Sequence, residues 1–309
     1  MIDFKIPNLD PNATIKSKLT SSIDLKALLV KMHSILAEAA DRFILPRFQK
    51  LDSNDIFQDG RFHEIITKAD REASTWILNH CRKEFPASYS EEDKRDENLT
   101  PELLWQVDPL DGTHEFKNGY CGFTIQAALL KKSQKDFQPL AGIIYSPLDH
   151  FSVYGGNEIG IFRKHQSTES RILVGPISSV ITIHARELDL PRNLSAIQKI
   201  FKEQWQCPVS LSFGGGAGNT FLQMLSGYEC GQSQIYLFPR NYTSEWDLSA
   251  AESLFEVLGG WICDFKGQAF TYNRGDPKNR NGFIAVLGLK KSEVLPLVKP
   301  WIIKELNHD

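Results

Sequence analysis

Hydrophobic positions recur at helical spacing near the start of the chain. This period predicts an amphipathic helix over residues 23–48, with an apolar stripe formed by Leu28, Met32, Leu36 and Ala39. A second helical pattern predicts a helix over residues 70–85. The first part of the chain is therefore expected to contain two helices.

Further along the chain the pattern becomes that of strands. Apolar runs bounded by turn residues predict an antiparallel sheet, with strands over residues 103–108, 123–131, 140–146 and 151–155. After Phe162 short strands alternate with helices, which are expected over residues 193–205, 217–226, 247–257 and 292–305. The change of pattern predicts an N-terminal α+β half over residues 1–165 and a C-terminal α/β half over residues 166–309.

Composition narrows the class of protein. The chain has 309 residues, 41% of them hydrophobic and 24% charged, which is ordinary for a globular protein with a sizeable core. A net charge of −3 gives no general attraction to nucleic acid polymers or anionic membranes. The apolar runs are too short to span a membrane, and residues 1–12 carry no signal pattern. Five scattered cysteines argue against a zinc site or disulfide framework and favour a cytoplasmic location.

Candidate chemistry is concentrated in the segment Asp-Pro-Leu-Asp-Gly-Thr at residues 108–113. Pro109 biases Asp108 toward an extended conformation, so that Asp108 and Asp111 can point into one pocket. The Leu110 carbonyl adds a neutral oxygen, and such oxygen sets are the ligands that Mg²⁺ prefers. Gly112 can bring backbone N–H groups close to an anion. The alternative is an ordinary turn that closes a hairpin.

Three further acidic segments accompany this one. Asp70 ends Ile-Thr-Lys-Ala-Asp at residues 66–70, Glu91 begins a Glu-Glu-Asp run, and Asp247 lies in Glu-Trp-Asp-Leu-Ser-Ala-Ala at residues 245–251. Together the four segments resemble the inositol monophosphatase superfamily of Mg²⁺-dependent, lithium-sensitive phosphomonoesterases, over about residues 60–290. Within it the chain is similar to the CysQ-type 3′(2′),5′-bisphosphate nucleotidases. This similarity rests on Asp-Gly-Thr-His-Glu-Phe at 111–116, Gly-Ile-Ile-Tyr-Ser-Pro at 142–147 and Phe-Pro-Arg at 238–240.

The resemblance implies an α+β fold, a layered αβαβα sandwich of the sugar/inositol phosphatase type, with the site between the two halves. It implies about two or three Mg²⁺ ions, because a cleft rich in carboxylates needs cations to offset their repulsion. The expected metal ligands are Glu91, Asp108, Leu110, Asp111 and Asp247. Metal-activated water would attack phosphorus in line, with Asp70, Glu91 and Thr113 as the catalytic residues that orient and deprotonate it.

Three of these roles have alternatives. Glu92 could take the place of Glu91. Asp70 could be a first-turn residue whose charge favours the helix dipole. Asp247 stands at a good N-cap position, so that its carboxylate could serve the helix alone.

The resemblance also implies that the substrate is a small phosphorylated metabolite, with contacts expected from Gly112, Thr113, Gly216, Arg240 and Asp247. The first choice is 3′-phosphoadenosine 5′-phosphate, then inositol monophosphate, then a sugar bisphosphate. Several segments depart from the nucleotidase pattern, which leaves this choice open: Gly-Gly-Gly-Ala-Gly-Asn-Thr-Phe at 214–221, the longer segment 228–234, His184-Ala185-Arg186, and His114 in place of a lysine. The aromatic residues are expected in the core. A catalytically silent ligand-binding member and a monomer or homodimer also remain open.

Overall fold

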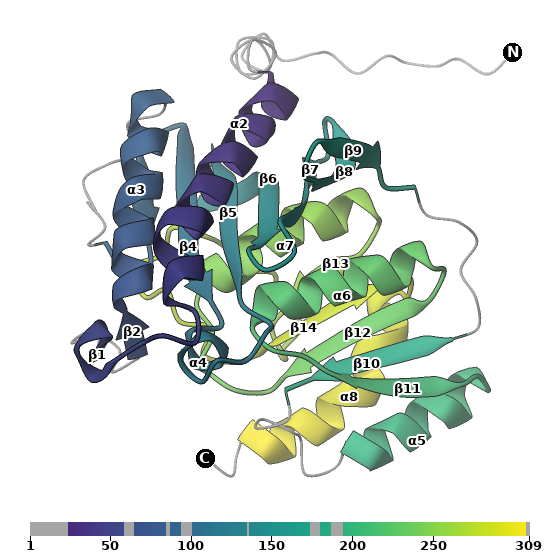
Figure 1. The fold of residues 1–309 in the computed structure, drawn as a ribbon. Coiled ribbons are helices and arrows are strands. Elements are labelled where there is room, and N and C mark those ends of the chain that lie inside the picture. Colours follow the sequence, from purple (N-terminus) through teal and green to yellow (C-terminus); the bar gives the residue numbers. More distant parts are fainter. Residues whose placement is uncertain are drawn as a thin grey trace, which may run out of the picture.

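The computed structural model of the protein describes residues 24–58, 65–84, 87–93, 101–134, 136–173, 180–186 and 194–306. Helices and sheets alternate in five layers (Figure 1). Helices α2 and α3 cover a seven-stranded sheet, α6 and α7 fill the space between the two sheets, and α5 and α8 cover the five-stranded sheet. The predicted α+β fold with its αβαβα layers is therefore confirmed. The expectation for residues 1–12 lies outside the described residues.

The first helix is shorter than the helix over residues 23–48 that the sequence predicts. Helix α2 spans Leu25–Ala39, and the chain continues through a π-helical turn at Ala40–Ile44 and a 3₁₀ turn at Leu45–Arg47. Pro46 in that last turn cannot donate a backbone hydrogen bond, which explains why regular helix does not extend to residue 48. A 3₁₀ turn at Ser53–Asp55 and the short strands β1 (Ile56–Gln58) and β2 (Ile65–Thr67) then lead into α3, Lys68–Glu84.

The seven-stranded sheet has the order β3-β4-β5-β6-β7-β8-β9. All of its pairs are antiparallel except β3 with β4. Its strands span Ser88–Ser90, Leu103–Asp111, Thr124–Ser133, Asp136–Ser146, Phe151–Gly156, Gly160–His165 and Thr168–Arg171. The register of β4 against β5 shifts between Asp108 and Asp111, so both carboxylates stand at an irregular strand end rather than after it.

The five-stranded sheet has the order β11-β10-β12-β14-β13, with β10 parallel to both of its neighbours and β14 antiparallel to both of its own. Its strands are Ile181–Ala185, Val209–Phe213, Ser233–Phe238, Trp261–Cys263 and Phe283–Leu287. The four predicted C-terminal helices are α5 (Leu194–Trp205), α6 (Ala217–Glu229), α7 (Trp246–Val257) and α8 (Lys291–Leu306). Strand β9 at 168–171 belongs to the first sheet although it follows residue 165. The division of the chain into two halves at residue 165 stays a prediction.

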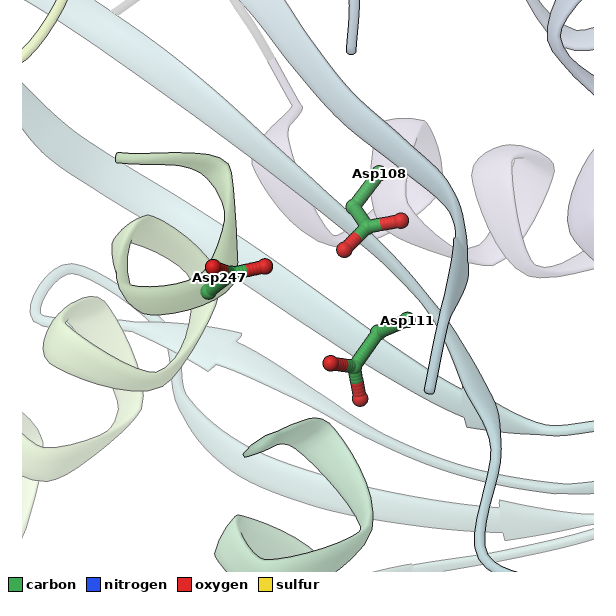
Figure 2. A group of neighbouring side chains, drawn as sticks. All are labelled: Asp108, Asp111 and Asp247. Atoms are coloured by element: carbon green, nitrogen blue, oxygen red, sulfur yellow. The ribbon is translucent and has the colours of Figure 1, made fainter. Parts of the chain in front are cut away.

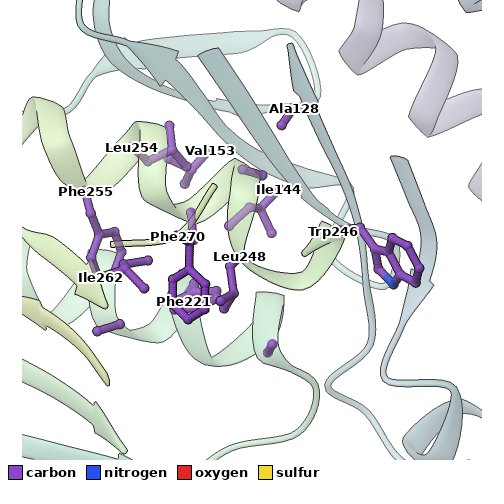
Figure 3. Packing of buried hydrophobic residues seen from close by; sticks show 14 of the residues in the cluster. Ala128, Ile144, Val153, Phe221, Trp246, Leu248, Leu254, Phe255, Ile262 and Phe270 are labelled. Atoms are coloured by element: carbon purple, nitrogen blue, oxygen red, sulfur yellow. The ribbon is translucent and has the colours of Figure 1, made fainter. Parts of the chain in front are cut away.

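The largest buried cluster lies between the sheets (Figure 3). Ile144 and Val153 of the first sheet pack toward α6 and α7, which contribute Phe221, Leu248 and Leu254. Burial of this apolar area fixes both middle helices against both sheets, and the N-termini of the two helices reach the same edge of the first sheet. The described part of the chain contains no helix with the length and apolar character to cross a membrane.

Candidate active site

Three aspartates meet at the edge of the first sheet. Asp108 and Asp111 come from the end of β4, and Asp247 comes from the first turn of α7. Each offers a carboxylate oxygen, and the three oxygens lie within 4.8 Å of one another. Figure 2 shows the carboxylates turned toward a common space. Such a cluster of hard oxygen donors fits the coordination chemistry of Mg²⁺.

The aspartates open into a cavity of about 430 Å³. The cavity is also lined by Glu91, Leu110, Gly112 and Thr113, all of them expected at the site. Glu92 is not among the described residues that line it, which favours Glu91 over its neighbour. The remaining described lining residues are Ile65, His114, Glu115, Arg186, Tyr242 and Ser244.

Electrostatic repulsion is strong in the cluster. Burial raises the pKa of Asp108 well above its ordinary range, and the charges of Glu91, Asp111 and Asp247 raise it further. Burial also raises the pKa of Asp111 to about 6 and that of Asp247 to about 7. Lys278 works in the opposite direction on Asp247, because its charge lowers that pKa. The raised pKa values mean that the cluster binds protons more readily than free carboxylates do, and a divalent cation can replace those protons.

The N-terminus of α6 holds Asp111 in place. The backbone N–H of Ala217 donates to Asp111 Oδ1 at 3.0 Å, and that of Gly218 donates to Oδ2 at 2.8 Å. The Thr124 hydroxyl donates to the same Oδ2 at 3.0 Å. Helix N-termini favour negative charge, so the arrangement fixes the carboxylate while leaving lone pairs for a metal. The glycine run thus approaches a carboxylate of the protein itself.

Gly216 is packed too closely against this carboxylate to carry a side chain. A Cβ at residue 216 would lie 2.5 Å from Asp111 Oδ2 and 3.0 Å from Gly112 Cα. We expect Gly216→Ala to displace Asp111 and to lower Mg²⁺-dependent phosphate release by about a hundredfold, as small misplacements of reacting groups do.

The control for this substitution is Gly275→Ala, because a Cβ at residue 275 would meet nothing within 4 Å. Both variants should unfold within a few degrees of the parent by circular dichroism. Equal initial rates for the two variants would contradict a role for Gly216 in holding Asp111.

Asp70 and Thr113 form a hydrogen-bonded pair beside the aspartates. The Thr113 hydroxyl lies 3.1 Å from Asp70 Oδ1 and 3.0 Å from the Leu110 carbonyl oxygen, and it can donate to either. The backbone N–H of Thr67 donates to Asp70 Oδ2 at 2.8 Å, and the Thr67 hydroxyl donates to the same oxygen. Burial raises the pKa of Asp70 to about 6, so the carboxyl is largely ionised at neutral pH and can accept a proton. Asp70 also lies in the first turn of α3, where its charge favours the helix dipole, so the two interpretations of this residue are compatible.

Asp247 does not occupy the N-cap position. Helix α7 begins at Trp246, so Asp247 is the second residue of its first turn, and its Oδ2 accepts the backbone N–H of Ser244 at 2.6 Å. Glu245 before it is buried and bound on both sides. Its Oε1 accepts the Tyr89 hydroxyl at 2.6 Å, and its Oε2 accepts the backbone N–H of Arg274 at 3.1 Å. Asp247 therefore follows a segment that is anchored to β3 and to the loop before β14.

Two residues expected to contact substrate have other surroundings. The backbone N–H of Gly216 donates to the Gly122 carbonyl at 2.9 Å, and Arg240 follows β12 without lining the cavity in the described part of the chain. Their contact with substrate stays a prediction. Residues 228–234 connect α6 to β12 at the end of the helix away from Asp111, about 20 Å along its axis, and they do not cover the site.

Sequence reasoning gave no role to Glu115 and Arg186, which line the cavity together. Arg186 Nη2 lies 3.1 Å from Glu115 Oε1. His184 is instead buried, and its Nε2 lies 2.7 Å from Gln234 Oε1. The position of Glu115 four residues after Asp111 is a signal that could have been used, because the helix after the metal loop returns it to the cavity.

Among known protein families, the inositol monophosphatase family matches this chain over residues 27–295. The chain belongs to the inositol monophosphatase family. It is a family of metal-dependent phosphatases that act on small phosphorylated substrates. The resemblance seen in the sequence, and its expectation of phosphatase chemistry, are confirmed at this level.

Individual relatives are distant. Inositol monophosphatase 3 of Xenopus laevis is 21% identical over 266 residues, which cover 80% of this chain and 70% of that protein. The 3′(2′),5′-bisphosphate nucleotidase CysQ of Aggregatibacter actinomycetemcomitans is 25% identical over 178 residues, 58% of this chain and 62% of the relative. The crystal structure of CysQ from Bacteroides thetaiotaomicron superimposes with a TM-score of 0.65 at 22% identity, covering 84% of this chain and 97% of that one. This last likeness concerns the fold.

Proposed function

We propose that this chain is a Mg²⁺-dependent phosphomonoesterase that hydrolyses a small phosphorylated metabolite with a metal-activated water. The observation that carries the proposal is the meeting of Asp108, Asp111 and Asp247 beside the Asp70–Thr113 pair in one cavity. Membership of the family supports the reaction class. Intact carboxylates and threonine argue against a catalytically silent member.

The donor set fits divalent cations. Asp108, Asp111 and Asp247 would hold about two or three Mg²⁺ ions together with Glu91 and the Leu110 carbonyl. Bound Mg²⁺ supplies positive charge for phosphate oxygens and lowers the pKa of water. The raised pKa values of the aspartates support this assignment, because buried carboxylates of like charge need a cation to stay ionised together.

The protein groups would orient and deprotonate the attacking water. When Thr113 donates its hydroxyl proton to Asp70, the Thr113 oxygen keeps lone pairs that can accept a hydrogen bond from water. The proton of that water would then pass through Thr113 to Asp70, whose pKa of about 6 suits a base at neutral pH. Glu91 would act as a metal ligand beside Asp108, Asp111 and Asp247. Gly112, which has a φ of 85°, and Thr113 would offer backbone N–H groups to the phosphate.

The substrate proposed first is 3′-phosphoadenosine 5′-phosphate, which would give AMP and phosphate. The CysQ relative from Aggregatibacter actinomycetemcomitans and the Phe-Pro-Arg segment at 238–240 support this choice. Inositol monophosphate is the alternative, supported by the relatives that are named inositol monophosphatases. A sugar bisphosphate ranks third. The five cysteines, all free thiols, are consistent with a cytoplasmic location.

The decisive experiment measures phosphate release from 3′-phosphoadenosine 5′-phosphate, inositol 1-phosphate and fructose 1,6-bisphosphate, each with and without Mg²⁺. We expect Mg²⁺-dependent release, with the highest kcat/KM on the nucleotide. No release from any ester at saturating Mg²⁺ would overturn the proposed function. Preference for inositol 1-phosphate would select the alternative.

Lithium provides a second test. If the metal centre works as in the lithium-sensitive members that the sequence resembles, millimolar Li⁺ should inhibit Mg²⁺-dependent phosphate release. The same concentrations of K⁺ serve as the control for ionic strength. Full activity across the Li⁺ titration would argue against membership of the sensitive branch.

A further inference from the structure

Exposed hydrophobic side chains gather around the candidate active site. The large hydrophobic residues that the described part of the chain exposes are Ile65, Tyr120, Leu173, Phe213 and Tyr242. Ile65 and Tyr242 line the cavity of the aspartates, whereas Tyr120 and Phe213 line a second cavity of about 540 Å³. Leu173 lines neither. Apolar groups exposed around a cavity are typical of a ligand site. Most aromatic residues of the described part lie in the core as expected, whereas Tyr120, Phe213 and Tyr242 are exposed.

The second cavity is continuous with the first. His114, Glu115 and Arg186 line both. Tyr120 follows the short helix α4 (Thr113–Lys117), and Phe213 ends β11, where it pairs with Ala185. The second cavity therefore lies between the metal loop of the first sheet and the edge strand β11 of the second sheet. A phosphate ester with its phosphorus at the aspartates would extend its remaining part into this space.

A hydrogen-bond acceptor stands at the junction of the two cavities. Glu115 is 9% exposed, and its Oε1 is bound by Arg186. Its Oε2 is buried and has no hydrogen-bond partner among the described residues. An unsatisfied buried carboxylate oxygen is costly, so a hydroxyl or amino donor of a ligand would be favoured at this point.

We propose that the second cavity selects a nucleoside as the non-reacting part of the substrate. The exposed faces of Phe213 and Tyr120 offer stacking surfaces for a planar base, and Glu115 Oε2 accepts a ribose hydroxyl or an exocyclic amino group. A polyol ring such as inositol offers hydroxyls but no π-face, so it would leave both aromatic rings exposed to water. This inference rests on the proposed function, because the phosphate must lie at the aspartates.

The test compares Phe213→Ala with Leu173→Ala. Both residues are exposed, at 49% and 72%, so neither substitution opens a hole in the core. We expect Phe213→Ala to raise the Kd for AMP, measured calorimetrically with Mg²⁺ present, and the KM for 3′-phosphoadenosine 5′-phosphate, each by about tenfold. Tyr120→Ala should act in the same direction. Inorganic phosphate should bind all three variants and the parent equally, and Leu173→Ala should leave every constant unchanged.

Failure of this inference is distinguishable from failure of the proposed function. Unchanged AMP binding and nucleotide KM in Phe213→Ala would overturn the nucleoside site while Mg²⁺-dependent phosphate release still supports the phosphatase. A parent protein that binds no AMP but hydrolyses inositol 1-phosphate would overturn it in the same way. If no ester is hydrolysed, the proposed function fails, and a loss of AMP affinity confined to Phe213→Ala and Tyr120→Ala would still support the cavity.

Discussion

Asp108→Asn should lower Mg²⁺-dependent phosphate release by about a thousandfold or more, because it removes one charged ligand from a centre whose ions supply several kcal/mol of transition-state stabilisation. The metal-free variant should nevertheless unfold at a higher temperature than the parent. Asp108 is buried, and like charges on three neighbours raise its pKa, so a neutral amide of the same shape relieves repulsion. The two effects are measured by initial rates at saturating Mg²⁺ and by thermal unfolding in EDTA.

Asp41→Asn is the matched control for that substitution, since its carboxylate is exposed on the outer helical layer. It should change neither the rate nor the unfolding temperature appreciably. Asp247→Asn should reproduce the behaviour of Asp108→Asn. A folded Asp108→Asn protein that keeps its activity would remove Asp108 from the set of metal ligands.

The second large effect is a pH dependence that Mg²⁺ reverses. The pKa values of Asp111 and Asp247 in the folded protein, about 6 and about 7, lie above the ordinary value of 3.8. Between these limits the metal-free folded state binds more protons than the unfolded state. The contribution of these two groups to the free energy of unfolding is therefore fully present near pH 4 and should be lost as the pH rises toward 7. Mg²⁺ must displace the same protons, so its affinity should rise by about tenfold per pH unit for each proton released in that window.

Thermal unfolding at pH 5.5 and pH 8, with and without Mg²⁺, measures both trends. The gain in Tm on adding Mg²⁺ should be large at pH 8 and small at pH 5.5. In Asp108→Asn the metal-free protein should show a flatter pH dependence, because one member of the interacting cluster is gone. An equal gain in Tm at the two pH values would mean that the ions do not bind at the titrating aspartates.

Local chemistry made much of the fold and part of the site predictable. The pattern of apolar residues located the strands from β4 to β7 and the helices from α5 to α8. The strands are buried along most of their length, so they read as short apolar runs between turn residues. Asp108 and Asp111 share a short segment whose proline and glycine restrict its backbone. The π-helical turn after Ala39 could not be predicted, since it leaves no sequence pattern that a longer α-helix would not also give.

Contacts between distant segments were the part that the sequence could not supply. The sequence predicts that Gly216 in the glycine run contacts substrate. The contact of this run and of the following α6 N-terminus with Asp111 joins residues 106 positions apart, which local pattern does not reveal. Asp247 was placed at a helix cap because its neighbours suggest one, but the helix begins one residue earlier. Exposure of Phe213 and Tyr120 likewise depends on the loops around them rather than on their own pattern.

The buried hydrogen bond between Tyr89 and Glu245 makes substitutions near the metal site differ in their effect from substitutions at the second cavity. Tyr89 lies two residues before Glu91, and Glu245 lies two residues before Asp247, so one hydrogen bond of 2.6 Å ties together the segments that carry both acids. We therefore expect substitutions there to disturb the proposed metal site whichever substrate is bound. Phe213 and Tyr120 line the second cavity instead, and both side chains are exposed. If the two proposals hold, substitutions at these exposed positions can change the preferred phosphorylated metabolite without altering the acids of the metal site.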